Sequence, residues 1–112
     1  MSFKMKNALA NLLGVREDLA EDPQTPVFLK KLDNGIAAEA NRDGTIYVDP
    51  SLSPAQMKKA VEHEMVHIDQ MRRGDLNYDN NNVYWKGKIY SRDKMPEGSK
   101  KLPWEAEAYK KS

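Results

Sequence analysis

The residues best suited to chemistry lie at positions 63–67, where the sequence reads HEMVH, an HExxH pattern. On an α-helix, residues four apart differ by about 40° around the axis and by about 6 Å along it, so His63 and His67 can bind one metal ion. Glu64 is rotated by about 100° from His63 and can act as general base on a metal-bound water without occupying a ligand position. The chain contains two histidines, and both fall in this pattern. The pattern therefore predicts a metal site.

Two imidazoles suit Zn²⁺ when a carboxylate completes the site and a fourth position stays open, so we expect an acidic third ligand. Glu105 and Glu107 are the leading candidates, and on a helix their side chains would point about 200° apart, so that only one can face the metal. Pro103 would start that helix and place Glu105 in its first turn, where the helix dipole favours a carboxylate. We therefore predict Glu105 as the ligand and expect Glu107 to support a ligand from outside or to lie at the surface. Asp75 and Asp79 are the next candidates if neither binds.

Composition excludes several classes of protein. At 112 residues the chain is expected to be a single domain, residues 1–112. It has no cysteine, which excludes a disulfide framework, thiolate zinc ligands and a cysteine nucleophile. A net charge of +1 argues against a dedicated binder of nucleic acid or of membrane surfaces. No apolar run approaches the roughly 20 residues that span a bilayer, and the N-terminal residues lack a clean signal-peptide pattern, so we expect a cytoplasmic protein.

The HExxH pattern lies within the best-defined predicted helix. Ser53 can cap this helix, Pro54 suits its first turn, and Gln56 completes a capping box with Ser53. The helix should run to about Arg73, with Gly74 ending it. Residues that recur at about 100° are expected on its core-facing side: Met57, Val61, Met65, Ile68 and Arg72.

The remaining elements complete a small α+β domain. Strand-like runs at residues 27–32, 36–40 and 45–48 are separated by Asn34-Gly35 and by Asp43-Gly44, which predicts a three-stranded antiparallel meander packed on the HExxH helix. A short amphipathic helix is expected at about residues 4–20 and a loop after residue 74. An extra hairpin is expected at residues 83–90 and a C-terminal helix, bearing the glutamates, at residues 103–111.

The order of these elements resembles that of the gluzincin metallopeptidases, whose smallest single-domain members are of this size. The likeness covers about residues 44–74 and 102–111: a strand, a connection that contains proline, the HExxH helix and a later helix with a glutamate. It implies that His63 and His67 bind zinc, that Glu64 is the catalytic base, and that the chain hydrolyses a peptide or amide bond. It also implies that the strand at residues 45–48 presents its edge to the backbone of the substrate.

The downstream helix of several gluzincin families reads Glu-x-x-Ala-Asp, in which the glutamate is the third ligand and the aspartate supports a histidine. Here Glu105 and Ala108 match, whereas Tyr109 stands in place of the aspartate, so a tyrosine hydroxyl would have to make the supporting hydrogen bond. The Lys-rich C-terminal half also resembles small metallopeptidase-like proteins encoded by tailed phages. That likeness implies a virion location as an alternative to the cytoplasm.

Several other side chains are candidates for a role near the metal. Asp69 and Gln70 could support His67, or they could be exposed. Trp85 and Trp104 are expected in the core or in the wall of a cleft. Any one of four tyrosines could stabilise an oxyanion, although packing is the commoner role of such rings: Tyr78, Tyr84, Tyr90 and Tyr109.

Two functions compete with peptide hydrolysis. A zinc-stapled structural or interaction protein, for example a phage virion component, would show little or no turnover. An amidase that cuts cell-wall cross-links would use the same chemistry, since proteins and peptidoglycan both present an amide carbonyl. The cleft of so short a chain should be shallow, so an assembly partner could present the substrate.

Overall fold

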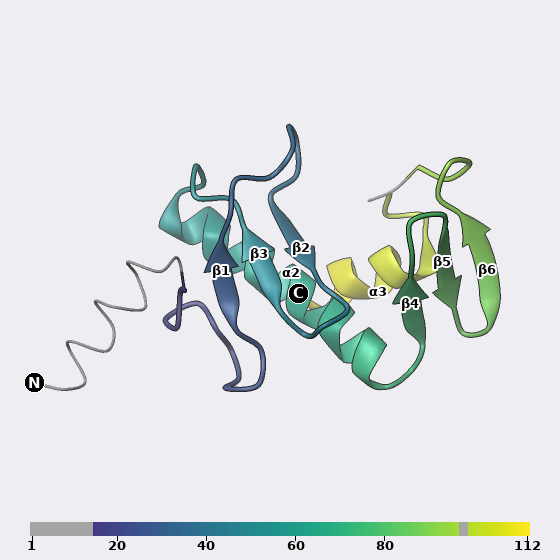
Figure 1. Ribbon diagram of the computed structural model, residues 1–112, viewed down its shortest axis with the longest axis horizontal. Helices are drawn as coiled ribbons and strands as arrows, with labels where there is room; N and C mark the ends of the chain where they lie inside the picture. The colour runs from purple at the N-terminus through teal and green to yellow at the C-terminus, as the bar shows by residue number, and fades with distance from the viewer. Residues whose placement is uncertain (1–14, 97–98) are drawn as a thin grey trace, which may run out of the picture.

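The computed structural model describes residues 15–96 and 99–112, and within them it contains two helices and two three-stranded sheets. The elements follow in the order β1 (Val27–Leu29), β2 (Ala38–Ala40), β3 (Ile46–Val48), α2 (Pro54–Arg72), β4 (Leu76–Tyr78), β5 (Asn82–Trp85), β6 (Lys88–Ser91) and α3 (Pro103–Lys111). The two sheets lie toward opposite ends of the molecule, and α2 runs from one to the other with α3 beside it (Figure 1). The α+β class is therefore confirmed.

The predicted antiparallel meander is wrong in its first half. The first sheet has the order β1-β3-β2, with β1 parallel to β3 and β2 antiparallel to it. The chain does not fold back at Asn34-Gly35, because the residues after β1 continue along β3: the Lys30 N–H donates to Val48 O and the Leu32 N–H donates to the Asp49 carboxylate. The connection then crosses to the far side of β3. The second predicted hairpin, between β2 and β3, is confirmed.

The helix predicted at about residues 4–20 is not found in the part that can be described. Residues 4–14 lie outside the described residues, and residues 15–20 form an isolated bridge between Val15 and Phe28 followed by turns. The Arg16 N–H donates to Val27 O of β1, and the Leu19 N–H donates to Arg16 O within the turn. At residues 15–20, a bridge to β1 and turns thus stand where the end of the helix was expected.

Helix α2 begins as predicted, with Ser53 as its cap. The Ser53 hydroxyl accepts the Gln56 N–H, and the Gln56 side chain accepts the Ser53 N–H, which completes the capping box. One face of α2 packs on the first sheet to form the first core: Val27, Ile46, Val48, Met57, Val61 and Ile68. Met65 is only partly buried against this core, and Arg72 instead reaches the Thr25 hydroxyl, so the predicted core face ends at Ile68.

The capping box makes a testable contribution to stability. Replacing an N-cap serine by alanine typically costs about 1 kcal/mol, because an N–H of the first turn loses its acceptor. We expect Ser53→Ala to lower the free energy of unfolding by that amount in urea titrations. Ser51→Ala is the matched control, since Ser51 lies outside α2 and its hydroxyl and N–H bond to the Asp49 carboxylate, not to an N–H of the helix. Equal stability of the two variants would contradict the assignment.

The second sheet has the order β4-β5-β6 and is antiparallel throughout. Its β5–β6 hairpin is the one predicted, and it turns at Lys86 and Gly87, whose φ values of 48° and 83° fit a two-residue turn. Strand β4 lies where a loop was expected, because three residues are too few to show a clear alternation. The second core is made by this sheet and the start of α3: Leu76, Val83, Trp85, Leu102 and Trp104. Among the described residues, neither helix combines the length and apolar character needed to cross a bilayer.

Candidate metal centre

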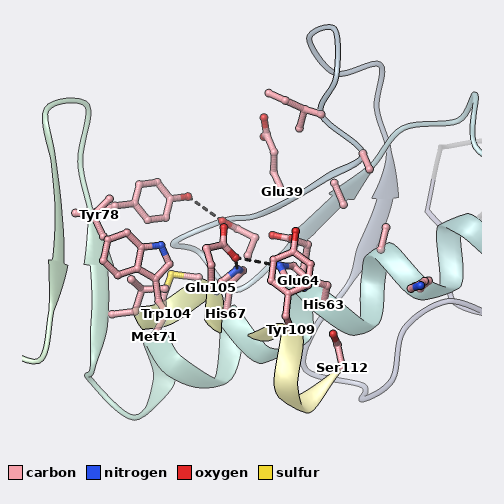
Figure 2. A pocket seen from close by; sticks show the side chains of 18 of the residues that line it. Glu39, His63, Glu64, His67, Met71, Tyr78, Trp104, Glu105, Tyr109 and Ser112 are labelled. Atoms are coloured by element: carbon pink, nitrogen blue, oxygen red, sulfur yellow. Dashed lines mark hydrogen bonds and ion pairs between the residues drawn. The ribbon is translucent and has the colours of Figure 1, made fainter. Parts of the chain in front are cut away.

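The three predicted ligands meet between the two helices. His63 and His67 project from α2, and Glu105 reaches them from the first turn of α3, 42 residues after His63 in the chain (Figure 2). Oε1 of Glu105 lies 3.0 Å from Nε2 of His63 and 2.7 Å from Nε2 of His67. All three donor atoms lie within 4.8 Å of one another. Ala108 of α3 is fully buried, in keeping with close packing of α3 on the rest of the protein.

The donor set fits a zinc ion. Two imidazole nitrogens and one carboxylate oxygen are the ligands of many catalytic zinc sites, which keep a fourth position open. Burial alone would raise the pKa of Glu105, but hydrogen bonds from His63 and His67 and the charges of both rings outweigh it and hold this pKa at about 2. Glu105 is therefore an anion at neutral pH, as a ligand must be. Such a group could hold a metal ion.

Glu64 lies beside the three donor atoms without being one of them (Figure 2). Burial raises its pKa to about 7; the His67 and His63 charges oppose this rise, and the Glu105 charge adds to it. A carboxyl group with a pKa near the working pH can both accept and release a proton. Glu64 could therefore exchange a proton with a group in the cleft, and its role as a base stays a prediction.

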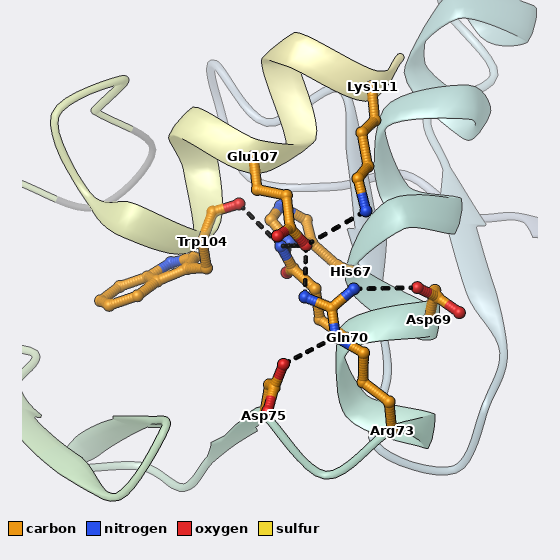
Figure 3. A network of polar contacts seen from close by, with 8 residues as sticks. All are labelled: His67, Asp69, Gln70, Arg73, Asp75, Trp104, Glu107 and Lys111. Atoms are coloured by element: carbon orange, nitrogen blue, oxygen red, sulfur yellow. Dashed lines mark hydrogen bonds and ion pairs between the residues drawn. The ribbon is translucent and has the colours of Figure 1, made fainter.

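Of the two residues that could support His67, Gln70 does so and Asp69 does not. Oε1 of Gln70 lies 2.8 Å from Nδ1 of His67, and Gln70 is fully buried. Asp69 is exposed and pairs with Arg73 (Figure 3). Because residues three apart share a helix face, the spacing of His67 and Gln70 was a usable sequence signal.

Glu107 lies on the far side of this contact from the metal ligands. Its carboxylate accepts a hydrogen bond from the Gln70 amide and pairs with Arg73 and, at 3.8 Å, with Lys111 (Figure 3). Glu107 therefore contacts none of the metal-ligand candidates directly, and it reaches His67 only through Gln70. The tyrosine at position 109 makes no such supporting contact; its ring packs against the ring of His63, with the centroids 4.4 Å apart.

The candidate centre opens into a cleft of about 850 Å³. Residues 35–40, which include β2, form one wall, and α3 forms another with Glu105 and Tyr109. Apolar side chains of α2, of the second sheet, of the loop after β6 and of α3 also line the cleft: Met71, Leu76, Val83, Met95 and Trp104. Trp85 and Trp104 are both buried in the second core, and Trp104 also lines the cleft, as expected for these rings.

The strand edge that faces the cleft belongs to β2, which corrects the sequence prediction for residues 45–48. Those residues include β3, which is the central strand and is paired on both sides. In the β2–β3 pair, Ala37 O and the Asn41 N–H bond to the partner strand, so by alternation the backbone groups of Ala38 and Ala40 point away from it. Ala40 O accepts the hydroxyl of Tyr78, which leaves Ala38 as the edge position of interest.

The structure separates the four candidate tyrosines. Tyr78 and Tyr109 line the cleft, and Tyr109 is the one that contacts a metal-ligand candidate. Tyr84 instead donates its hydroxyl hydrogen to Asp79, and Tyr90 packs edge-on against Trp104, 5.0 Å between centroids. The latter two rings are absent from the lining of this cleft in the described part of the chain.

Comparison of the chain with protein-family models found no match, and searches of curated proteins and of solved structures also found none.

Proposed function

We propose that this protein is a zinc-dependent hydrolase that cleaves a peptide or amide bond. The observation that carries the proposal is the meeting of Glu105, from a separate helix, with the two histidines of the HExxH pattern beside Glu64 in an open cleft. A helix that carried HExxH by chance would have no reason to receive a carboxylate at this point. His63, His67 and Glu105 would hold the metal, and Glu64 would be the general base.

Each part of the site has a role in this proposal. A zinc ion, when bound, would supply a Lewis acid for the substrate carbonyl and for the attacking water. Glu64 accepts the proton of that water and later releases it to the leaving nitrogen, as its pKa of about 7 allows. The hydroxyl of Tyr109 is the candidate donor to the developing oxyanion. Ala38 offers its backbone N–H and C=O to an extended substrate, in the manner of an added strand.

The cleft favours a substrate with an apolar side chain next to the scissile bond. Its end toward the second sheet is lined by Met71, Val83, Trp104 and apolar neighbours. An extended chain that pairs with β2 while its carbonyl is held at the candidate centre would direct a side chain toward this end. Peptides with a leucine or phenylalanine beside the cleaved bond are therefore the first substrates to test, with casein and purified cell wall as further ones.

The experiment that tests the proposal combines metal analysis with turnover. We expect the purified protein to contain close to one zinc per chain by elemental analysis, and to cleave a member of a peptide library in a reaction that a chelator stops. Release of cell-wall fragments without cleavage of peptides would favour the amidase instead. Protein that holds no zinc after dialysis against micromolar zinc would refute the proposal.

A zinc-stapled structural protein is the second candidate, favoured by the position of the site between two cores. The histidines lie on α2, which packs on the first sheet, and Glu105 lies on α3, which packs on the second. A bound ion would tie these two units together. Tight zinc binding with no turnover on any of the substrates above would support this candidate.

Removal of the metal should lower thermal stability under either proposal. An ion that binds only the folded state adds about 2.7 kcal/mol when its free concentration is 100 times Kd. We therefore expect a chelator to lower Tm by several degrees in differential scanning fluorimetry. Glu105→Ala is the control and should show a much smaller shift. The same Tm with and without chelator, for protein shown to carry zinc, would contradict the expected link between the metal and the two helices.

A further inference from the structure

The side-chain amide of Gln70 is the most constrained polar group next to the candidate centre. Gln70 is fully buried, yet its amide makes three hydrogen bonds within the described residues. Oε1 lies 2.8 Å from Nδ1 of His67, and Nε2 lies 3.0 Å from Trp104 O and 3.1 Å from a carboxylate oxygen of Glu107 (Figure 3). The amide therefore connects a histidine of α2 with two groups of α3.

The partners of Gln70 determine which way its amide faces. A backbone carbonyl and a carboxylate can only accept hydrogen bonds, so the NH₂ group must face Trp104 and Glu107. The amide oxygen must then face His67, and because this oxygen can only accept, Nδ1 of His67 must carry a hydrogen. Without a bound metal, Nε2 also carries a hydrogen and donates it to Glu105. A metal that displaced this hydrogen would find a neutral ring with its remaining hydrogen on Nδ1 and a lone pair on Nε2. Nε2 is the atom that lies 2.7 Å from Glu105.

The carboxylate of Glu107 is itself held in place by Arg73. Arg73 donates to its carboxylate and is itself paired with Asp69 and Asp75. The carboxylate is thus held where it accepts from the Gln70 amide, and an amide turned by 180° would place two oxygens against each other there. The arrangement leaves one orientation for Gln70.

We infer that Gln70, oriented by Glu107 and by Trp104 O, is a positioning residue that fixes His67 in the tautomer able to bind a metal through Nε2. The inference rests on the proposed function, because it assigns a role to Gln70 only if His67 is a ligand. Gln70 is not one of the metal-ligand candidates, and it would act through the ring of His67. Outer-shell partners of this kind commonly change metal affinity by about 10- to 100-fold.

The test compares zinc affinity among three variants, measured by competition with a chromophoric chelator. Gln70→Met keeps the length of the side chain but removes the acceptor for Nδ1, and we expect it to weaken zinc binding by about 10- to 100-fold. Glu107→Ala keeps Gln70 but removes one of the two groups that orient it, and we expect a loss near the lower end of that range. Asp69→Asn is the matched control, because Asp69 contacts the same Arg73 but not Gln70, and its affinity should equal that of the wild type.

A second readout separates positioning from a merely structural role. In ¹H–¹⁵N spectra of the zinc-loaded wild type, we expect His67 to show a hydrogen on Nδ1 that exchanges slowly with water. In Gln70→Met this signal should exchange rapidly or disappear. Gln70→Met could instead be less stable than the wild type in the presence of chelator, yet keep the wild-type zinc affinity and the wild-type Nδ1 signal. That result would overturn the inference.

The outcomes also distinguish this inference from the proposed function. A wild type that binds no zinc would refute the proposed function itself. A wild type that binds zinc, together with Gln70→Met of equal affinity, would refute only the role of Gln70. If Gln70→Met does not fold, the test rests on Glu107→Ala, because the Glu107 side chain is partly exposed and its loss should be tolerated. A zinc affinity of Glu107→Ala equal to that of Asp69→Asn would then overturn the inference.

Discussion

Glu64→Gln is expected to retain zinc and to lower the rate of hydrolysis by about 10²- to 10⁴-fold, the usual contribution of a general base. The substitution keeps the size of the side chain and removes only its ability to accept the proton. Glu64 is not part of the group of metal-ligand candidates, so metal content should not change. Elemental analysis and initial rates on the best library peptide measure the two quantities.

Glu62→Gln is the matched control for this prediction. Glu62 lies two residues earlier on α2 and lines a different surface hollow, away from the cleft. Its variant should retain both zinc and activity. Loss of zinc from Glu64→Gln would mean that Glu64 is a ligand, and full activity of that variant would mean that another group is the base.

Glu105→Ala is expected to weaken zinc binding by more than about 100-fold, since the loss of a ligand should exceed the effect of an outer-shell partner. Glu105 lies within hydrogen-bond distance of both histidine Nε2 atoms, whereas Glu107 contacts neither. Glu107→Ala should therefore have the smaller effect, close to 10-fold. The two affinities are compared at one pH by chelator competition, with circular dichroism to establish that both variants fold.

The reverse order of these two effects would overturn the assignment of the third ligand. Wild-type affinity in both variants would mean that neither carboxylate is a ligand. Asp79 would be a poor replacement, because its carboxylate already accepts from the Tyr84 hydroxyl and from the N–H groups of Asn81 and Asn82. Asp75 pairs with Arg73 and so is also committed elsewhere.

Local signals explain which features could be predicted from the sequence. The Ser53 capping box, the start of α3 at Pro103 and the β5–β6 hairpin each depend on a few neighbouring residues, and all three are present. The arrangement of His63 and His67 follows from helix geometry alone. Glu105 was favoured by its place in the first turn of a helix, and the docking of α3 on α2 brings it to both histidines.

Features that depend on distant pairing were not predictable in this way. The parallel pairing of β1 with β3 joins residues 27–29 to residues 46–48, and no local pattern distinguishes it from a meander. Gln70 is close to His67 by helix spacing, but its burial and its bonds to Trp104 and Glu107 depend on where α3 docks. The edge strand could be assigned to β2 only once the order of the first sheet was known.

The distance in sequence between His63 and Glu105 has a consequence for the order of folding. Joining two points 42 residues apart costs about 3 kcal/mol of chain entropy in a flexible chain. Here β4, β5 and β6 lie between the two residues, and because they pair with near neighbours they can form early and shorten the effective loop. A nascent chain should thus hold zinc weakly, through its two histidines, until α3 docks. Capture of the ion would then act as a late step that marks completed folding.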